Sequence, residues 1–97
     1  QIRAQLAVTD VGPRMYHLRQ QGGRHEVDLV LELSGGKVIG IEVKADSAPG
    51  RNAARHLRWM RDVLGERFIR GLVLHTGTGA YALGQRISAV PISTLWA

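Results

Sequence analysis

Apolar and polar residues alternate along two neighbouring stretches of the chain, residues 26–33 and 37–44. Alternation with a period of two is typical of β-strands that are buried on one face. Ser-Gly-Gly lies between the stretches, so together they predict a β-hairpin. A nearly continuous apolar run at residues 68–75 predicts a strand covered on both faces. Two shorter strands are expected elsewhere, at residues 15–19 and 87–92. Pro91 favours a sheet edge for the second of them.

A helix is predicted between the hairpin and the buried strand. Its four core-facing positions recur at helical spacing: Ala53, Leu57, Met60 and Leu64. Asp46 or Ser47 can cap its start, Pro49 suits its first turn, and Gly65 is well placed to end it. Residues 1–7 are expected to form a further helix. This order of elements predicts an α/β fold in which helices pack on a mixed sheet.

The length of the hairpin turn decides which residues oppose each other. A two-residue Gly-Gly turn would place Leu29 opposite Glu42 and mix apolar and charged residues on both faces. A three-residue turn places Leu31 opposite Ile39 and keeps the apolar residues of both strands together. We therefore predict the three-residue turn. It gathers seven apolar residues on the face expected to be buried: Val27, Leu29, Leu31, Leu33, Ile39, Ile41 and Val43.

The same register gathers charged residues on the other face of the hairpin. Asp28 is expected opposite Glu42, and Glu26 opposite Lys44. Like charges in directly opposed positions destabilise a sheet, so a counter-charge is expected near the acidic pair. Mg²⁺ or Mn²⁺ would supply it, because both take carboxylate oxygens as ligands, and Lys44 could reach a nearby water or phosphate oxygen. The alternative is a solvated surface with an ordinary Glu26–Lys44 ion pair.

Composition narrows the class of protein. The 97 residues, 44% of them hydrophobic, suffice for one domain with one core. The chain has no cysteine, which excludes a disulfide framework and a thiolate metal site. No apolar run reaches the length of a membrane span, and we expect a cytoplasmic protein. Thirteen Lys and Arg against eight Asp and Glu give a net charge of +5, which favours an anionic partner such as nucleic acid.

Three arginines follow the side of the predicted helix that faces away from its apolar positions: Arg51, Arg55 and Arg58. A positive stripe of this kind suits the phosphate backbone of a nucleic acid. A solvated helix face, with Arg58 paired to Asp62 one turn later, explains the same pattern equally well.

The acidic pair and its lysine also carry a resemblance. Asp28, followed after the hairpin by Glu42-Val43-Lys44, resembles the D…(D/E)-x-K signature of the PD-(D/E)XK nuclease superfamily, which includes restriction enzymes and Holliday-junction resolvases. Four segments are similar to a narrower family: HEVDLVLE, GKVIGIEVKA, LGERFIRGLVLHTG and VPISTLW. That family is the domain of unknown function at the C-terminus of prokaryotic AAA+ ATPases, and the similarity runs from about Arg14 to Trp96.

The resemblance implies a restriction-endonuclease-like mixed sheet with flanking helices, formed by residues 1–97 as one domain. It implies that Asp28 and Glu42 hold Mg²⁺ or Mn²⁺ and that Lys44 orients or activates the attacking water. Nucleic acid, DNA above all, would be the substrate, and an ATPase domain would be covalently linked. Many members add an acidic residue from a preceding helix, which QIRAQLAV lacks, so Glu26 or a residue before Gln1 is the candidate. The alternative is a non-catalytic module for nucleic-acid binding or assembly.

Overall fold

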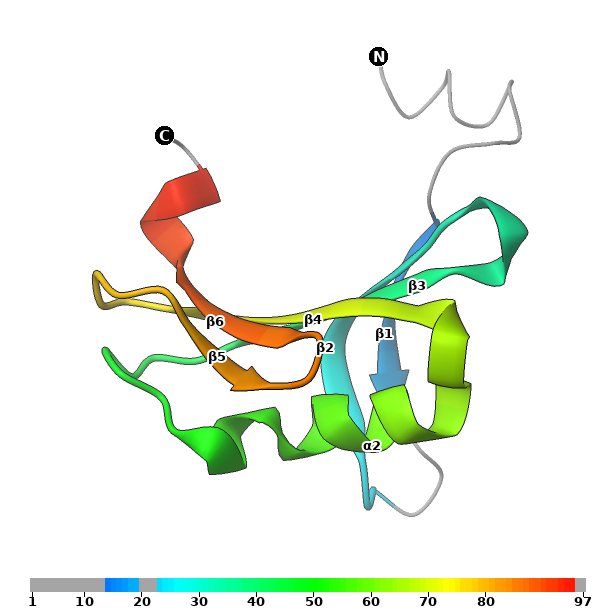
Figure 1. Ribbon diagram of the computed structural model, residues 1–97, viewed down its shortest axis with the longest axis horizontal. Coiled ribbons are helices and arrows are strands. Elements are labelled where there is room, and N and C mark those ends of the chain that lie inside the picture. The colour runs from blue at the N-terminus through cyan, green and yellow to red at the C-terminus, as the bar shows by residue number, and fades with distance from the viewer. Residues whose placement is uncertain (1–13, 20–22, 96–97) are drawn as a thin grey trace.

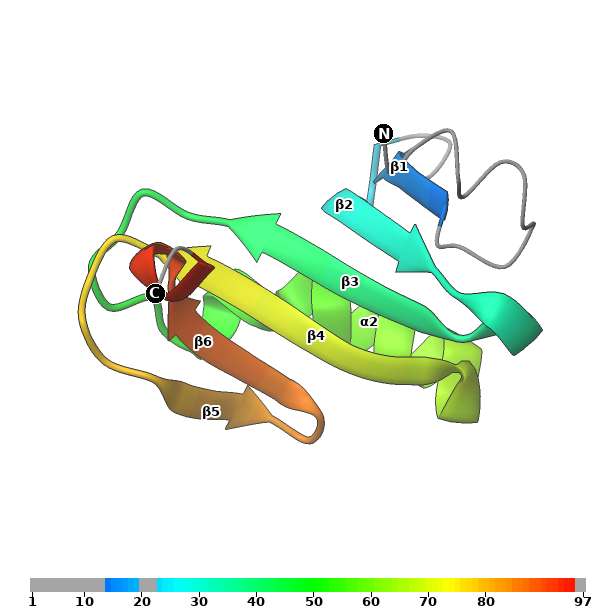
Figure 2. The ribbon, with the colours of Figure 1, turned by 90° about the horizontal axis from the view of Figure 1, so that it is seen from above.

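The computed structural model describes residues 14–19 and 23–95, which form a six-stranded mixed sheet with helix α2 (Arg55–Leu64) along one face (Figures 1 and 2). The strands are β1 (Arg14–Arg19), β2 (Glu26–Glu32), β3 (Val38–Val43), β4 (Phe68–His75), β5 (Tyr81–Gly84) and β6 (Ile87–Pro91). Their order in the sheet is β1-β2-β3-β4-β6-β5. Strand β4 runs parallel to both β3 and β6, and the other neighbours are antiparallel. The predicted α/β fold with a mixed sheet is confirmed. The helix predicted at residues 1–7 lies outside the described residues.

The predicted register of the hairpin is confirmed where its strands pair. Leu29 pairs with Ile41, and Leu31 pairs with Ile39. At the turn, the Leu33 N–H donates to the Lys37 carbonyl at 2.7 Å. The three turn residues form the short 3₁₀ segment η1 (Ser34–Gly36), whose two glycines have φ values of 79° and 77°. These positive values suit glycine, which explains why the turn sequence is Ser-Gly-Gly.

The face of the hairpin that packs on the helix differs from the predicted one. Buried residues on β3 are Val38, Gly40 and Glu42, whereas Ile39 and Ile41 are half-buried. A Cβ on Gly40 would lie 2.8 Å from Leu57 Cδ2 of α2, so the helix packs against the glycine-bearing face. A second glycine, Gly71 on β4, is crowded in the same way by Phe68 and Leu57. The helix therefore covers the face on which two glycines, which have no side chain, leave room for it.

A bulge in β2 explains why Val27 is also part of the core. Leu18 of β1 pairs with Val27 and Tyr16 pairs with Val30, so Asp28 and Leu29 together oppose one residue of β1. The extra residue puts Val27 and Val30 on the same side of the sheet, and both are buried. The prediction that Val27 shares a face with Leu29 is wrong for this reason.

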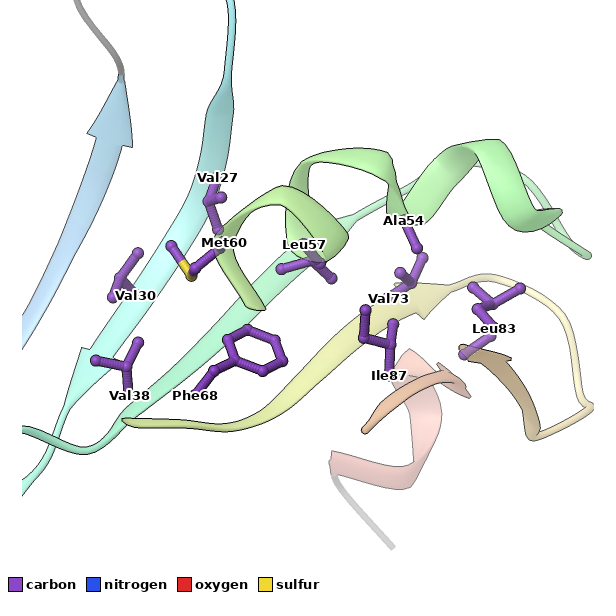
Figure 3. Close-up of a cluster of buried hydrophobic side chains, with 11 residues drawn as sticks. Val27, Val30, Val38, Ala54, Leu57, Met60, Phe68, Val73, Leu83 and Ile87 are labelled. Carbon is purple, nitrogen blue, oxygen red and sulfur yellow. The ribbon is translucent and has the colours of Figure 1, made fainter. Parts of the chain in front are cut away.

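The core lies between α2 and the sheet, as Figure 3 shows. Its buried apolar residues are Val27, Val30, Val38, Ala54, Leu57, Met60, Phe68, Val73, Leu83, Ile87 and Ala89. The predicted core positions of the helix are confirmed, since Leu57 and Met60 are buried and Ala53 and Leu64 pack against the cluster. Gly65 ends α2 as its C-cap with a φ of 59°, also as predicted.

The helical region begins later than predicted. The 3₁₀ segment η2 (Arg51–Ala54) precedes α2, and neither segment has a side-chain cap. Asp46 and Ser47 lie before both, because the chain there still runs beside β4, where the Asp46 carbonyl accepts from the Thr76 N–H at 3.0 Å. Two further 3₁₀ segments are η3 (Gly65–Arg67), which follows α2, and η4 (Ile92–Leu95), which ends the described chain.

The last predicted strand exists, but it does not lie at an edge. Strand β6 lies between β4 and β5, and its Pro91 pairs with His75 at the final position. The edge strand next to β6 is β5. Its four residues, YALG, are too short to show a recognisable strand pattern in the sequence. In the described part of the chain, no helix has the length and apolar character needed to cross a membrane.

Candidate metal and nucleic-acid site

Asp28 and Glu42 lie at the point where β2 and β3 stop pairing. The last ladder pair is Leu29–Ile41, one residue away from both acidic residues. Beyond it the Asp28 Oδ2 accepts a hydrogen bond from the Val43 N–H at 2.8 Å, so the side chain of Asp28 takes the place of a backbone partner. The bulge in β2 includes Asp28 and turns it toward β3. The two predicted acidic residues are therefore neighbours.

Glu42 is the unusual member of this pair. Its side chain projects from the helix-covered face of β3, and only 3% of the residue is exposed. Burial is the main reason that the pKa of Glu42 is raised from 4.5 to about 8, and the negative charge of Asp28 is the second. Its Oε2 atom is buried without a hydrogen-bond partner in the described structure. A buried polar atom of this kind is costly unless something satisfies it.

Lys44 lies two residues after Glu42 and is half-buried. Its positive charge opposes the other effects on the pKa of Glu42 and favours the ionised carboxylate. The Lys44 N–H donates to the Leu74 carbonyl at 2.8 Å, which fixes its backbone beside β4. The structure thus gathers the three residues of the predicted motif at the ends of β2 and β3.

Glu26 takes partners on β1 instead of the predicted Lys44. Its Oε2 accepts from Arg19 Nη2 at 3.3 Å and lies 3.1 Å from His17 Nε2. The hydrogen bond and charge of Arg19 are the main reason that the pKa of Glu26 is lowered. Within residues 14–19 and 23–95, no group of three or more His, Asp or Glu side chains is placed to hold a metal ion. Glu26 thus interacts with Arg19 and His17 of β1 and not with Lys44.

The three arginines of the predicted stripe differ in their surroundings. Arg51 and Arg55 are exposed, whereas Arg58 Nη1 donates to the carbonyl of Arg51 at 2.6 Å. Asp62 accepts from Arg61 Nε at 3.1 Å, so it pairs with its neighbour and not with Arg58 as the alternative had it. Arg55 faces a cavity that it shares with Lys44. Arg55 is the member of the three that lines this cavity.

The cavity contains residues that sequence reasoning missed. Its volume is about 340 Å³, and it is lined by Lys44, Asp46, Gly50, Asn52, Ala53, Arg55 and His56. His56 Nδ1 lies 3.4 Å from the Glu26 N–H and 3.4 Å from His25 Nδ1, and His25 stacks on Trp59 with a centroid distance of 4.3 Å. Asn52 and His56 lie at least eight residues beyond the motif, so no local spacing could have linked them to it.

The chain was compared with protein families, curated proteins and solved structures. Residues 1–95 match the family model described as Domain of unknown function (DUF4143). No curated protein matches the chain. A solved complex of EndoMS with double-stranded DNA is similar with a TM-score of 0.44 and 20% sequence identity, over 78% of this chain and 34% of that one. The chain thus spans about a third of the length of that protein. From the family match we conclude that the chain belongs to the DUF4143 family.

Proposed function

We propose that this member of the DUF4143 family hydrolyses phosphodiester bonds of nucleic acid with the help of Mg²⁺ or Mn²⁺ held by Asp28 and Glu42. The observation that carries the proposal is the buried carboxyl of Glu42, whose Oε2 lacks a hydrogen-bond partner beside the Asp28 carboxylate. Two neighbouring carboxylates and a lysine on two adjacent strands are also the elements of the PD-(D/E)XK signature that the sequence resembles.

The residues present fit a hard divalent cation. Mg²⁺ and Mn²⁺ prefer carboxylate oxygens and keep positions for water, so two protein carboxylates are a reasonable set of ligands. A cation would supply the unpaired Glu42 oxygen with a partner and would offset the repulsion between Glu42 and Asp28. When bound, it would act as a Lewis acid on the phosphate and would help to deprotonate water.

Lys44 and Asp28 would have separate tasks in the reaction. The ammonium group of Lys44 would donate to the attacking water or to a phosphate oxygen and so stabilise the negative charge that develops there. Asp28 would hold its position through the hydrogen bond from the Val43 N–H to its Oδ2, and its carboxylate would be one ligand of the cation. Glu42 would give up its proton at neutral pH when it binds the cation, because its pKa is about 8.

Positive charge supports nucleic acid as the substrate. The chain carries a net charge of +5, and Arg55 lies in a cavity beside Lys44. Arg51 and Arg58 extend the positive surface along the start of the helical region. We propose DNA as the substrate from the nuclease resemblance alone. From the same resemblance we propose that the domain is joined to an AAA+ ATPase, and from its composition we propose that it works in the cytoplasm.

A second function is a nuclease-fold module that binds nucleic acid or assembles with an ATPase without cleavage. One observation favours it. The described residues provide two carboxylates at the site and no cluster of three potential metal-binding side chains, since Glu26 is engaged by Arg19 and His17. The same positive surface would then serve binding alone.

Cleavage separates the two functions. The protein is incubated with end-labelled single- and double-stranded DNA and RNA in Mg²⁺ or Mn²⁺, beside Lys44→Ala and the control Lys37→Ala. Lys37 is exposed at the hairpin turn, so its replacement removes one positive charge away from the site. The nuclease proposal expects products from the wild type and from Lys37→Ala, and none from Lys44→Ala despite unchanged metal binding. No product from any variant favours the non-catalytic module, and equal product from Lys44→Ala contradicts the role proposed for Lys44.

A further inference from the structure

The cavity beside the acidic pair has the size and position of a binding site. Its volume of about 340 Å³ lies near the lower end of the range of about 300–1,000 Å³ that is usual for small-molecule sites. Lys44 belongs both to the cavity and to the motif of Asp28 and Glu42, so the two sites adjoin. A cavity of this size suits one nucleotide unit and is too small for a base-paired duplex.

The charges that line the cavity favour an anion. Lys44 and Arg55 contribute two cations, and Asp46 is the one acidic side chain in the lining. A guanidinium group can hold a phosphate through two parallel hydrogen bonds, and a lysine adds a point charge. The amide of Asn52 adds donors and an acceptor. The carboxylate of Asp46 can accept hydrogen bonds from the hydroxyl groups of a sugar.

His56 adds a neutral donor to this lining. The Glu26 N–H lies 3.4 Å from His56 Nδ1 and can only donate, so Nδ1 is the acceptor and the proton of the neutral ring is assigned to Nε2. Burial lowers the pKa of His56, and the charge of Arg55 lowers it further, which favours the neutral ring. His56 therefore lines the cavity as a neutral ring with its N–H at Nε2.

The wall of the cavity between residues 45 and 50 is held by β4 and β5. Thr76 donates through its backbone N–H and its Oγ1 to the Asp46 carbonyl, at 3.0 Å and 3.1 Å. Tyr81 Oη donates to the Pro49 carbonyl at 2.7 Å. Gly77 packs so closely on the backbone of this wall that a Cβ would lie 1.8 Å from a carbonyl oxygen. The lining is thus anchored before a ligand arrives, which lowers the entropic cost of binding.

We propose that this cavity binds the terminal phosphate of a nucleic-acid strand and thereby presents strand ends to the site of Asp28 and Glu42. A terminal phosphate is a monoester with a charge near −2 at neutral pH, whereas an internal phosphate carries one charge. The two cations of the lining match the higher charge of the monoester, and Asn52 and His56 are further hydrogen-bonding residues of the lining. A monoester also enters a cavity from one side, whereas an internal phosphate continues in two directions. The link to cleavage rests on the proposed function, but the binding does not.

Binding is measured without metal, in EDTA, so that the result does not depend on cleavage. Fluorescence anisotropy compares single-stranded oligonucleotides of one sequence that carry a phosphate or a hydroxyl at the 5′ end, with the label at the 3′ end, and a second pair that differs at the 3′ end. In one of the two pairs, we expect the wild type to bind the phosphorylated oligonucleotide about tenfold more tightly than the one with a hydroxyl at that end. A difference of this size is expected for charged hydrogen bonds. Arg55→Gln should reduce this preference to about twofold or less.

Arg51→Gln is the matched control, because Arg51 is exposed nearby and does not line the cavity. It should weaken binding of both oligonucleotides equally and preserve the preference. A nucleoside 5′-monophosphate should compete, but more weakly than the phosphorylated oligonucleotide. Equal affinity of the wild type for phosphate and hydroxyl ends, or the same preference in Arg55→Gln as in the wild type, would overturn the proposal. So would tighter binding of the free nucleotide. Cleavage failing while the preference persists would reject only the proposed function.

Discussion

Replacing Glu42 by Gln should make the metal-free domain more stable, by an amount that depends on pH. A pKa of about 8 in place of 4.5 means that the folded domain keeps a proton that the unfolded chain releases. The stability of the wild type should therefore be unaffected below pH 4.5 and should fall as pH rises from 4.5 to 8. At about 1.4 kcal/mol for each pH unit, the cost approaches the order of 5 kcal/mol above pH 8. Gln resembles the protonated carboxyl, so the variant should escape this loss.

Urea denaturation in EDTA at pH 5, 7 and 9 measures the effect through the free energy of unfolding. Glu42→Gln should match the wild type at pH 5 and exceed it increasingly at pH 7 and 9. The control Glu66→Gln removes an exposed carboxylate far from the site and should follow the wild type at every pH. If wild type and Glu42→Gln show the same difference at pH 5 and pH 9, Glu42 is not a destabilised buried acid and the electrostatic account of the site fails.

Three further changes test the packing and the surface. Gly40→Ala should lower the free energy of unfolding by about 1–3 kcal/mol, because its Cβ would lie 2.8 Å from Leu57 Cδ2. Gly50→Ala should cost much less, because the space around Gly50 is open. Urea denaturation of both variants measures the difference. Tyr81→Phe should lose about 1 kcal/mol by the same assay, because it removes the hydrogen bond to the Pro49 carbonyl, and no loss would make that bond unimportant. Joint replacement of Arg51, Arg55 and Arg58 by Ala should make nucleic-acid binding less dependent on salt concentration. An unchanged slope of affinity against salt concentration would show that they do not contact the nucleic acid.

The register of the hairpin could be predicted, but the face that the helix covers could not. Alternation and the Ser-Gly-Gly turn leave one pairing that keeps apolar residues together, which is the pairing that brings Leu31 opposite Ile39. The same alternation pointed to the wrong buried face, because it counts apolar side chains and ignores the space a helix needs. Gly40 and Gly71 provide that space on the other face. Their role cannot be recognised from the strand sequences alone, because it depends on contacts with α2.

The candidate site shows the same division. The proximity of Asp28 and Glu42 followed from the register, whereas the burial of Glu42 did not, because sequence patterns treat a carboxylate as exposed. Glu42 is buried on the face of β3 that also carries Gly40, against which α2 packs. His56 and Asn52 reach the cavity from the helical region, and their distance from the motif along the chain concealed them. Tertiary packing therefore supplied what local pattern could not.

Calorimetric titration of the protein with Mn²⁺ at pH 7, in two buffers that differ in ionisation enthalpy, tests the central claim most directly. If Asp28 and Glu42 hold the cation, binding should appear at millimolar Mn²⁺ or below and should release about one proton, because Glu42 with its pKa of about 8 is mostly protonated at pH 7. Asp28→Asn should abolish the heat, and Glu66→Gln should preserve it. No heat from the wild type at several millimolar Mn²⁺, or the same heat from Asp28→Asn as from the wild type, would contradict a metal site at this acidic pair.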